Sequence, residues 1–511
     1  MGPVGALRPR IAYPLAVLTG LLYFVSFPGV DVWPLAFVSL APLLIAMRGQ
    51  PVRRAAGLGW AAGFTMTMTG FYWLMEMLRV FSGFPTPVCF LFMCILCAFQ
   101  GGRIGLCGWL YGRAATRGWP AEAVFLGAFA TSELLYPLLF PWYFGATMHL
   151  APALTQVADL GGPILVGLMV ATTSVAVAEL VQSRREKRRL RRGWIIAGVA
   201  VPALAAVYGL VRIASVDAAV AGAEKIRLGI VQPNLPIFDR KSALPLHQRM
   251  TRELAKENVE LVVWSEAAVP MGFNEAAYEK DVPRKLTAAL GVSTVVGTVL
   301  VRDEPNTPRG RRLFNTALIA DEKGAIGGRY DKHYLLMFGE YLPFGEMLPI
   351  LYKYSPNSGR FSPGETMDAL DWRGHRIGAL ICYEDIIPSF VNELMRHDDP
   401  DLLVNLTNDA WFGDTTEPWI HFALAKMRAV EQRRFLVRAT NSGVSGIIDP
   451  VGRVVANTGA FVTEKVIGEV GFMKGGTVYR VIGDIPWYVI AVVMAAMSIF
   501  TIPARWRRTA R

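Results

Sequence analysis

The sequence begins with a series of apolar segments, each close to the length needed to cross a lipid bilayer. A membrane-spanning helix needs about 20 consecutive apolar residues. Such segments fill the first two-fifths of the chain, and one more lies near its end. In chain order they are a hairpin over 11–47 that turns at 28–34, then 55–75, 86–106, 119–139, 162–178, 194–211 and 485–504. We therefore expect eight transmembrane helices.

The composition agrees with a membrane protein. Hydrophobic residues make up 53% of the 511 residues, whereas charged residues make up only 18%, against about 25% in soluble chains. This composition excludes a disordered chain, a collagen and a coiled coil.

The positive charge is confined to the apolar part of the chain. Residues 216–484 contain 31 Lys and Arg against 34 Asp and Glu, a net charge of −3. Of the totals of 52 and 41, the remainder therefore keeps 21 basic and 7 acidic residues. Basic residues that flank apolar segments orient a membrane protein, so we expect no nucleic-acid partner.

The basic flanks give a consistent topology. If the eight segments alternate, all of these flanks lie on one side: residues 8–10, 53–54, 113–117, 184–192 and 505–511. That side is the cytoplasm under the positive-inside rule. We expect a seven-helix transmembrane bundle over 1–215, a periplasmic domain over 216–484, and an eighth helix with a basic cytoplasmic tail over 485–511. The first segment has no obvious cleavage site, so we interpret it as a retained helix.

Two ionisable residues lie in or near the apolar segments, namely Arg103 and Glu133. Charged side chains in a membrane usually face a partner inside the bundle. We expect Glu133 to pair with Arg103 or with a neighbouring helix.

From Lys225 onward the sequence changes to short β-branched runs separated by turn residues. The predicted strands are 226–231, 261–264, 292–299, 315–320, 377–382, 402–406 and 445–448, and the predicted helices are 247–257, 278–290 and 419–434. Alternating strands and helices indicate an α/β domain. The near-continuous apolar strands predict sheets that are covered on both faces.

Cys382 is the only cysteine of this domain, because the other four lie between residues 89 and 107. No disulfide can form within the domain. An unpaired thiol in an oxidising compartment is either buried and inert or a reactive nucleophile.

The setting of Cys382 favours the nucleophile. It ends an apolar strand and is followed at once by polar residues, so its thiol can face a cleft. A nucleophilic cysteine needs a general base and a nearby cation. Glu266 follows another predicted strand and Lys332 lies in a polar turn, and these two residues supply both groups.

These residues stand in motifs that resemble the Glu-Lys-Cys signature of the nitrilase superfamily: Trp264-Ser265-Glu266, Tyr330-Asp331-Lys332-His333 and Ile381-Cys382-Tyr383-Glu384. With its apolar segments, the whole chain resembles the bacterial apolipoprotein N-acyltransferase family. Four further runs carry the resemblance: Phe140-Pro141-Trp142, residues 338–343, residues 405–413 and residues 438–443.

The resemblance implies eight transmembrane helices joined to an α/β nitrilase-like domain with a four-layer αββα sandwich. It also implies an enzyme of the bacterial inner membrane that needs no cofactor and acts as a monomer. Glu266 would deprotonate Cys382, the thiolate would take an acyl chain from a phospholipid as a thioester, and Lys332 would stabilise the oxyanion with the backbone N–H after Cys382. The acceptor would be the α-amino group of a diacylated apolipoprotein.

The resemblance further assigns supporting roles. Glu340 would support Lys332 or the acyl intermediate, and Asn315 would hold polar groups. Tyr383 and Glu384 would shape the pocket, and Trp142 would lie at the outer end of the fifth segment. The apolar stretches 335–344 and 350–361 would in isolation be core or loop packing. In a domain next to a bilayer we expect them to act as lids that contact lipid. The chain departs from the family at 232–238, where relatives often carry a Trp and Phe238 is the available substitute.

Three other interpretations of the sequence compete with this one. His333, His375 and His421 invite a metal site, but the sequence has no compact His/Cys cluster, so we expect no metal. A membrane-tethered amidase would use the same three residues and release the acyl group to water. A non-catalytic lipid-binding or transport protein is the third possibility, and the complete Glu-Lys-Cys set argues against it.

Overall fold

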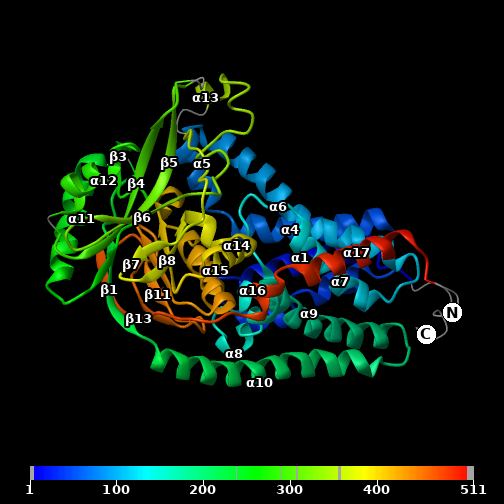
Figure 1. Ribbon diagram of the computed structural model, residues 1–511. Helices are drawn as coiled ribbons and strands as arrows, with labels where there is room; N and C mark the ends of the chain where they lie inside the picture. The colour runs from blue at the N-terminus through cyan, green and yellow to red at the C-terminus, as the bar shows by residue number, and fades with distance from the viewer. Residues whose placement is uncertain (1–4, 238, 289, 306–308, 355–357, 503–511) are drawn as a thin grey trace. The chain divides into compact units, whose positions relative to one another are not determined.

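The computed structural model describes residues 5–237, 239–288, 290–305, 309–354 and 358–502, and the chain divides into two units (Figure 1). The first unit comprises Met1–Met75, Pro87–Ile213 and Val481–Arg511, and the second comprises Glu76–Thr86 and Ala214–Arg480. The segment 76–86, which the sequence analysis placed with the apolar part, thus belongs to the second unit.

The first unit is helical. Its helices are α1 (Pro9–Ser26), α2 (Ala36–Ser39), α3 (Ala41–Met47), α4 (Val52–Gly70), α6 (Thr86–Ala115), α7 (Ala121–Leu135), α8 (Pro152–Thr155), α9 (Ala158–Arg185) and α17 (Ile485–Ile499). Among the described residues, four helices cross a unit boundary: α6, by its first residue Thr86 alone, and α5 (Leu74–Ser82), α10 (Arg192–Gly222) and α16 (Val478–Ile482).

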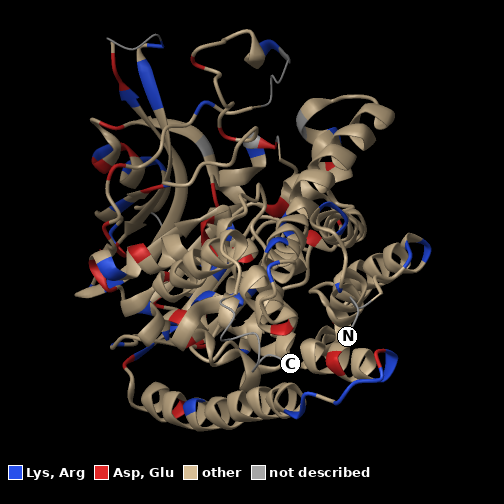
Figure 2. Cartoon of the chain, turned by 90° about the vertical axis from the view of Figure 1, so that its right-hand side faces the viewer, with Lys and Arg blue, Asp and Glu red and all other residues tan. Residues whose placement is uncertain are grey.

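Helical segments occur at all eight positions where the sequence predicts a membrane span. Within the described residues, four helices are both long and apolar enough to cross a membrane, namely α1, α6, α9 and α10. The apolar helical segments 33–47 and 485–499 are shorter. Helix α10, along the bottom of Figure 2, carries few charged residues. The first unit therefore has the helices of a membrane protein, while the count of eight spans stays a prediction.

The predicted pairing of Glu133 is confirmed. The Nη2 atom of Arg103 lies 3.4 Å from Oε1 of Glu133, and both side chains are fully buried. The guanidinium also lies 3.5 Å from the centre of the Trp142 ring and donates a hydrogen bond to the Trp142 carbonyl. Trp142 therefore has a structural contact inside the first unit, where it packs on a buried cation.

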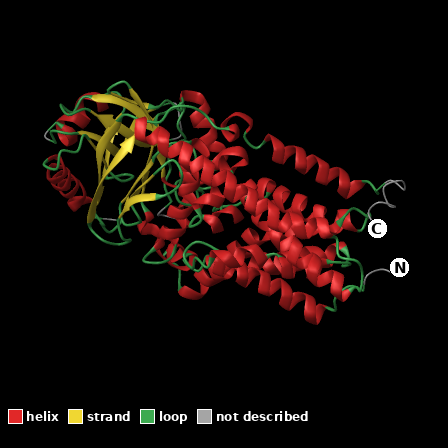
Figure 3. Cartoon of the chain, turned by 90° about the horizontal axis from the view of Figure 1, so that it is seen from below, coloured by secondary structure: helices red, strands yellow, loops and turns green. Residues whose placement is uncertain are grey.

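All strands lie in the second unit, where they form two sheets (Figure 3). The first sheet has the order β13 (Glu464–Gly471), β1 (Lys225–Gln232), β2 (Leu261–Val263), β4 (Ser293–Asp303), β5 (Arg311–Ala320), β6 (Ile326–Asp331), with β3 (Val269–Asn274) also paired to β4. The second has the order β12 (Val454–Asn457), β11 (Gly446–Ile448), β10 (Leu436–Thr440), β9 (Leu402–Thr407), β8 (His375–Ile381), β7 (Leu370–Trp372). Strands β1, β2 and β4 run parallel, as do β8, β9 and β10.

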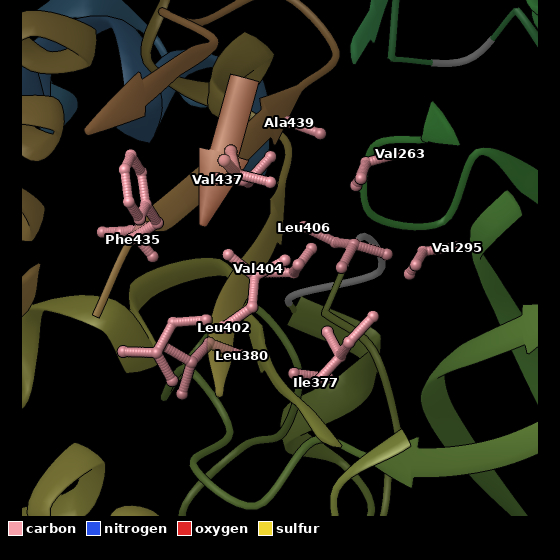
Figure 4. Packing of buried hydrophobic residues seen from close by; sticks show 14 of the residues in the cluster. Val263, Val295, Ile377, Leu380, Leu402, Val404, Leu406, Phe435, Val437 and Ala439 are labelled. Carbon is pink, nitrogen blue, oxygen red and sulfur yellow. The ribbon is translucent and has the colours of Figure 1, made fainter. Parts of the chain in front are cut away.

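The inner faces of the two sheets pack against each other. Val263 and Val295 of the first sheet belong to the same buried cluster as Ile377, Leu402 and Val404 of the second (Figure 4). Full burial of such a side chain contributes about 1.5–3 kcal/mol. This contact is the core that fixes the two sheets together.

The outer faces are covered by helices. Successive side chains of a strand point to opposite faces, and Val262, next to Val263, packs outward with Met250 and Leu254 of α11 (Arg240–Ala255). The other helices and turns of this unit are α12 (Tyr278–Val282), η3 (Pro283–Thr287), α13 (Leu351–Tyr354), η4 (Cys382–Ile386), α14 (Pro388–Asp398), η5 (Asp409–Phe412) and α15 (Glu417–Gln432). Helices α14 and α15 pack on the second sheet through β8 and β10. The layers run helix, sheet, sheet, helix, which confirms the predicted α/β fold.

The structure corrects several boundaries. Helix α12 ends at Val282 and a π-helical turn follows over Pro283–Thr287, so the predicted helix 278–290 is α-helical only in its first part and is shorter than predicted. Pro283 explains this, because a proline has no N–H for the α-helical pattern. The sequence analysis also missed β10, since the charged Arg438 interrupts its apolar run.

Gly297 lets β4 pass close to the turn that carries Glu266. A Cβ atom at this position would lie 2.2 Å from the carbonyl oxygen of Ser265 and 3.0 Å from the Cα of Glu266. Both atoms belong to the backbone, which cannot move aside as a side chain can.

We predict that Gly297→Ala destabilises the second unit by about 1–3 kcal/mol, the usual range for overpacking. Thermal unfolding of the full chain measures this. Gly229→Ala in β1 is the matched control, because its Cβ would meet only the side chain of Leu254. Equal unfolding temperatures for the two variants would contradict the prediction.

Candidate active site

Cys382 lies at the carboxyl end of β8, in a strained turn. Its φ angle is +56°, in the left-handed region that non-glycine residues rarely adopt. Two hydrogen bonds hold the turn: the N–H of Ile381 donates to Glu384 Oε2 at 2.7 Å, and Asn405 Nδ2 donates to the Cys382 carbonyl at 2.8 Å. A strained residue persists only where its surroundings hold it, so the turn keeps this sulfur at the edge of the sheet.

Lys332 and two carboxylates meet at the ends of the first sheet. Lys332 follows β6, and its Nζ lies 2.7 Å from Glu340 Oε2 and 3.4 Å from Glu266 Oε1. Asn315 of β5 donates through Nδ2 to Glu266 Oε1 at 2.7 Å and to Glu340 Oε1 at 3.1 Å. One ammonium and one amide thus hold both carboxylates.

Burial shifts the pKa values of these groups. Burial lowers the pKa of Lys332, which is only 1% exposed, but Glu340 and Glu266 outweigh it and raise the pKa well above its ordinary value. Burial raises the pKa of Glu266, and Lys332 and Asn315 partly oppose this. The lysine therefore stays charged, while Glu266 is a stronger base than an exposed carboxylate.

Cys382 lies within the electrostatic reach of this cluster. Burial and the Glu266 charge raise the pKa of the thiol well above 9, whereas Lys332 and a hydrogen bond from Thr407 lower it. The resting group is therefore a protonated thiol, and it needs a base to become a nucleophile.

Glu384 and Tyr383 fasten the turn to the Lys332 loop. Glu384 accepts the N–H groups of His333 and Tyr334 at 2.7 and 3.0 Å, besides that of Ile381. Burial raises the pKa of Glu384 to about 7. The Tyr383 hydroxyl donates to the Leu335 carbonyl at 3.0 Å, and its ring centre lies 5.6 Å from Lys332 Nζ.

A buried charge network, which the sequence did not predict, lies behind the turn that carries Cys382. His421 of α15 contacts Asp385 Oδ1 through Nε2 at 2.9 Å and Asp409 Oδ1 through Nδ1 at 3.1 Å. Arg438 of β10 donates to Asp409 Oδ2 at 3.1 Å. In the sequence, the residue that could have indicated this network is Arg438, a charged residue within a short apolar run.

His421 is an imidazolium in this network. Both ring nitrogens face carboxylate oxygens, so both must donate. Burial and Arg438 lower the pKa of His421, but the two aspartates outweigh them and raise it to about 10. The network thus balances two carboxylates with two cations and ties the ends of β8, β9 and β10 to α15.

Asp409, Glu417 and His421 also lie close enough to one another to hold a metal ion. The sequence analysis considered only His and Cys ligands and did not foresee this group. However, the imidazolium of His421 cannot act as a ligand, and Arg438 already neutralises Asp409. The donor set therefore fits an ion-pair network better than a metal site.

The structure brings Glu266, Lys332, Asn315 and Glu340 into direct contact. It places Cys382, Tyr383 and Glu384 in the adjoining turn. The remaining predicted supporting residue, Trp142, belongs to the first unit, and Phe238 lies outside the described residues.

Two family models match separate parts of this chain. Residues 19–176 match the family "Apolipoprotein N-acyltransferase N-terminal domain", and residues 227–474 match the family "Carbon-nitrogen hydrolase". A solved structure of Nit3 from Saccharomyces cerevisiae, a member of branch 10 of the nitrilase superfamily, is 18% identical. That match covers 55% of this chain and 97% of Nit3, with a TM-score of 0.37.

Relatives that match this chain over nearly their whole length show which family it belongs to. The apolipoprotein N-acyltransferase of Geobacter metallireducens is 30% identical over 510 residues, covering 96% of each chain. Those of Azotobacter vinelandii and Pseudomonas putida are 31% and 29% identical, covering 91% of this chain and 90% and 92% of theirs. The chain therefore belongs to the apolipoprotein N-acyltransferase family.

Proposed function

We propose that this protein transfers an acyl chain from a phospholipid to the α-amino group of a diacylglyceryl-modified cysteine, the N-terminal residue of an apolipoprotein. The observation that carries the proposal is the buried contact of Glu266 with Lys332 beside the strained turn of Cys382. The relatives named above supply the substrate class.

In the first half-reaction, Glu266 takes the proton from Cys382 Sγ. The thiolate attacks the ester carbonyl of the phospholipid, and a tetrahedral intermediate forms. The ester C–O bond then breaks, and the leaving oxygen takes the proton back from Glu266. The products are a lysophospholipid and a thioester on Cys382.

Lys332 stabilises the negative charge that develops on the carbonyl oxygen, together with the backbone N–H of Tyr383. A buried donor placed in advance stabilises such charge more than water does. Because the Lys332 ammonium is held by Glu340 and Glu266, it needs no reorganisation during the reaction.

In the second half-reaction, the amine of the apolipoprotein attacks the thioester. Glu266 accepts the proton of the amine, the C–S bond breaks, and the sulfur is reprotonated. An amide forms, so the acceptor leaves with three acyl chains. This order is a ping-pong mechanism.

The remaining contacts support these steps. Glu340 positions the Lys332 ammonium, and Asn315 keeps Glu266 and Glu340 in place through two hydrogen bonds. Glu384 holds the nucleophile turn against the Lys332 loop, while Tyr383 forms one wall beside the sulfur.

We further propose that the chain spans the bacterial inner membrane eight times as a monomer, with residues 216–484 in the periplasm. The distribution of basic residues supports this orientation.

Hydrolysis of the thioester by water is the main alternative, and the relatives' names do not favour it, since they are transferases. A non-catalytic lipid-binding protein would have no use for a buried lysine between two carboxylates, which is expensive to maintain.

We predict that the purified protein, given phospholipid and a diacylated lipopeptide, yields N-acylated peptide and lysophospholipid in equal amounts. Mass spectrometry of both products measures this. Cys382→Ser should form no acyl-enzyme, because an alcohol is much harder to ionise than a thiol. Free fatty acid without N-acyl peptide would favour the hydrolase instead.

We predict that Glu266→Gln slows formation of the acyl-enzyme by roughly a hundredfold or more, the usual contribution of a general base. The amide keeps the shape of the side chain but cannot accept the thiol proton. The burst of lysophospholipid measures the rate. Glu260→Gln, a change at an exposed position, is the control, and a normal burst from Glu266→Gln would refute the role.

We predict that Lys332→Ala shifts the acid limb of the pH profile to higher pH as well as lowering the rate. Glu266 must be ionised to act, and Lys332 lowers its pKa, so removal of the cation raises that pKa. The rate of acyl-enzyme formation against pH measures the shift. Lys323→Ala removes an exposed lysine as control, and a slower Lys332→Ala enzyme with an unmoved acid limb would count against this account.

A further inference from the structure

A cavity of about 580 Å³ lies beside the loop that carries Lys332, within the second unit. Its lining combines basic and aromatic side chains, including Arg309, Arg311, Arg312, Tyr334, Tyr352 and Phe361. We call it the arginine pocket. None of the steps proposed above uses it.

The lining of the arginine pocket contains three arginines and one glutamate. Arg309 pairs with Glu346, the acidic residue of the lining, and Arg312 pairs with Glu304 and Glu365 at 3.0 and 3.6 Å. No ion pair to Arg311 occurs in the part of the chain that the structure describes. The pocket is therefore suited to an anion.

An aromatic ring of the lining, Tyr352, holds the guanidinium of Arg309 and that of Arg360, a residue outside the lining. The guanidinium of Arg360 lies 3.9 Å from the centre of the Tyr352 ring, and that of Arg309 lies 5.6 Å from the same centre. Stacking on an aromatic ring holds a guanidinium in a fixed orientation, and planar guanidinium groups bind phosphate oxygens in pairs.

The segment that lines one side of the pocket also exposes large apolar side chains. Phe344 and Met347 are 71% and 79% exposed, and Leu348 and Ile350 are more than half exposed. Such an apolar patch next to basic residues is typical of a surface that contacts lipid, because the arginines then lie at the level of the phosphates.

The pocket adjoins the reacting groups. His333, Tyr334 and Leu335 line it and follow Lys332 directly in the chain. The carbonyl of Leu335 accepts the hydroxyl of Tyr383, the residue after the nucleophile. In a phospholipid the phosphate and the acyl ester are joined through the same glycerol, so one lipid can place both groups here.

We propose that the arginine pocket binds the phosphodiester of the donor phospholipid, and that the enzyme thereby selects phosphate-bearing lipids over neutral acyl esters. This inference rests on the proposed function, in which a phospholipid is the donor. Arg311 and Arg312 bind the phosphate oxygens, and Glu346 limits the charge by holding Arg309.

Binding is measured on the full chain carrying Cys382→Ala, which cannot turn over. Native mass spectrometry counts bound phosphatidylglycerol against diacylglycerol with the same acyl chains. We expect Arg311→Gln and Arg312→Gln each to weaken phosphatidylglycerol binding roughly tenfold, the size of one charge-assisted hydrogen bond. We expect the same two variants to bind diacylglycerol as tightly as the chain with Cys382→Ala alone. Arg284→Gln, an exposed arginine outside the pocket lining, is the matched control.

A substitution that should strengthen phosphatidylglycerol binding tests the same proposal. Glu346→Gln releases Arg309, so we expect it to strengthen phosphatidylglycerol binding. In the active enzyme, Arg311→Gln and Arg312→Gln should raise the apparent KM for phosphatidylglycerol, whereas acylation by a p-nitrophenyl ester, which has no phosphate, stays near the original rate.

Several outcomes overturn the proposal. Unchanged phosphatidylglycerol binding in both arginine variants would do so, as would equal losses with the p-nitrophenyl ester. Displacement of the lipid by equimolar inorganic phosphate would indicate a simple ion site. A raised KM for the lipopeptide alone would indicate an acidic acceptor instead. If the arginines bind the lipid but wild-type Cys382 gains no acyl group, the proposed function fails and the pocket stands.

Discussion

The ammonium of Lys332, buried between two carboxylates, is the interaction on which the site depends. Removing such charges from water costs several kcal/mol for each ion, and attraction repays this only when the geometry is tight. Here Asn315 supplies the extra hydrogen bonds, holding Glu266 and Glu340 by a single amide. The same burial that makes the cluster expensive makes Glu266 basic and keeps the thiol protonated. The burial of these charged groups therefore sets both the cost of the cluster to the stability of the fold and the basicity of Glu266.

The turn that carries Cys382 needs a second set of buried charges. Cys382 keeps a left-handed backbone, a strained conformation that its neighbours must over-determine. Glu384 fastens the turn from the side of the Lys332 loop, and the network of Asp385, His421 and Asp409 fastens it from behind. Because Arg438 completes the balance of charge, the turn is held by groups that cannot separate without leaving a buried ion unpaired.

The stacking of the two sheets brings these groups together. Glu266 and Lys332 follow strands of the first sheet, whereas Cys382 follows a strand of the second. The apolar core between the sheets, which includes Val263 and Ile377, fixes one sheet edge against the other. The arginine pocket extends the same edge, so a lipid bound there would lie next to the cluster.

The sequence by itself determined the two-part organisation and the α/β class, and it predicted Glu266, Lys332 and Cys382 as the reactive residues, because hydrophobic length, strand periodicity and short motifs are local properties of a chain. It also predicted supporting roles for Asn315, Glu340 and Glu384, but only through resemblance to a family. Tertiary structure alone decided that one amide holds two carboxylates, that His421 and Arg438 lie behind the nucleophile, and that Arg309, Arg311 and Arg312 line a cavity. Those facts depend on the stacking of two sheets and on loop conformation, and the residues concerned are too far apart along the chain for any local pattern to reveal them.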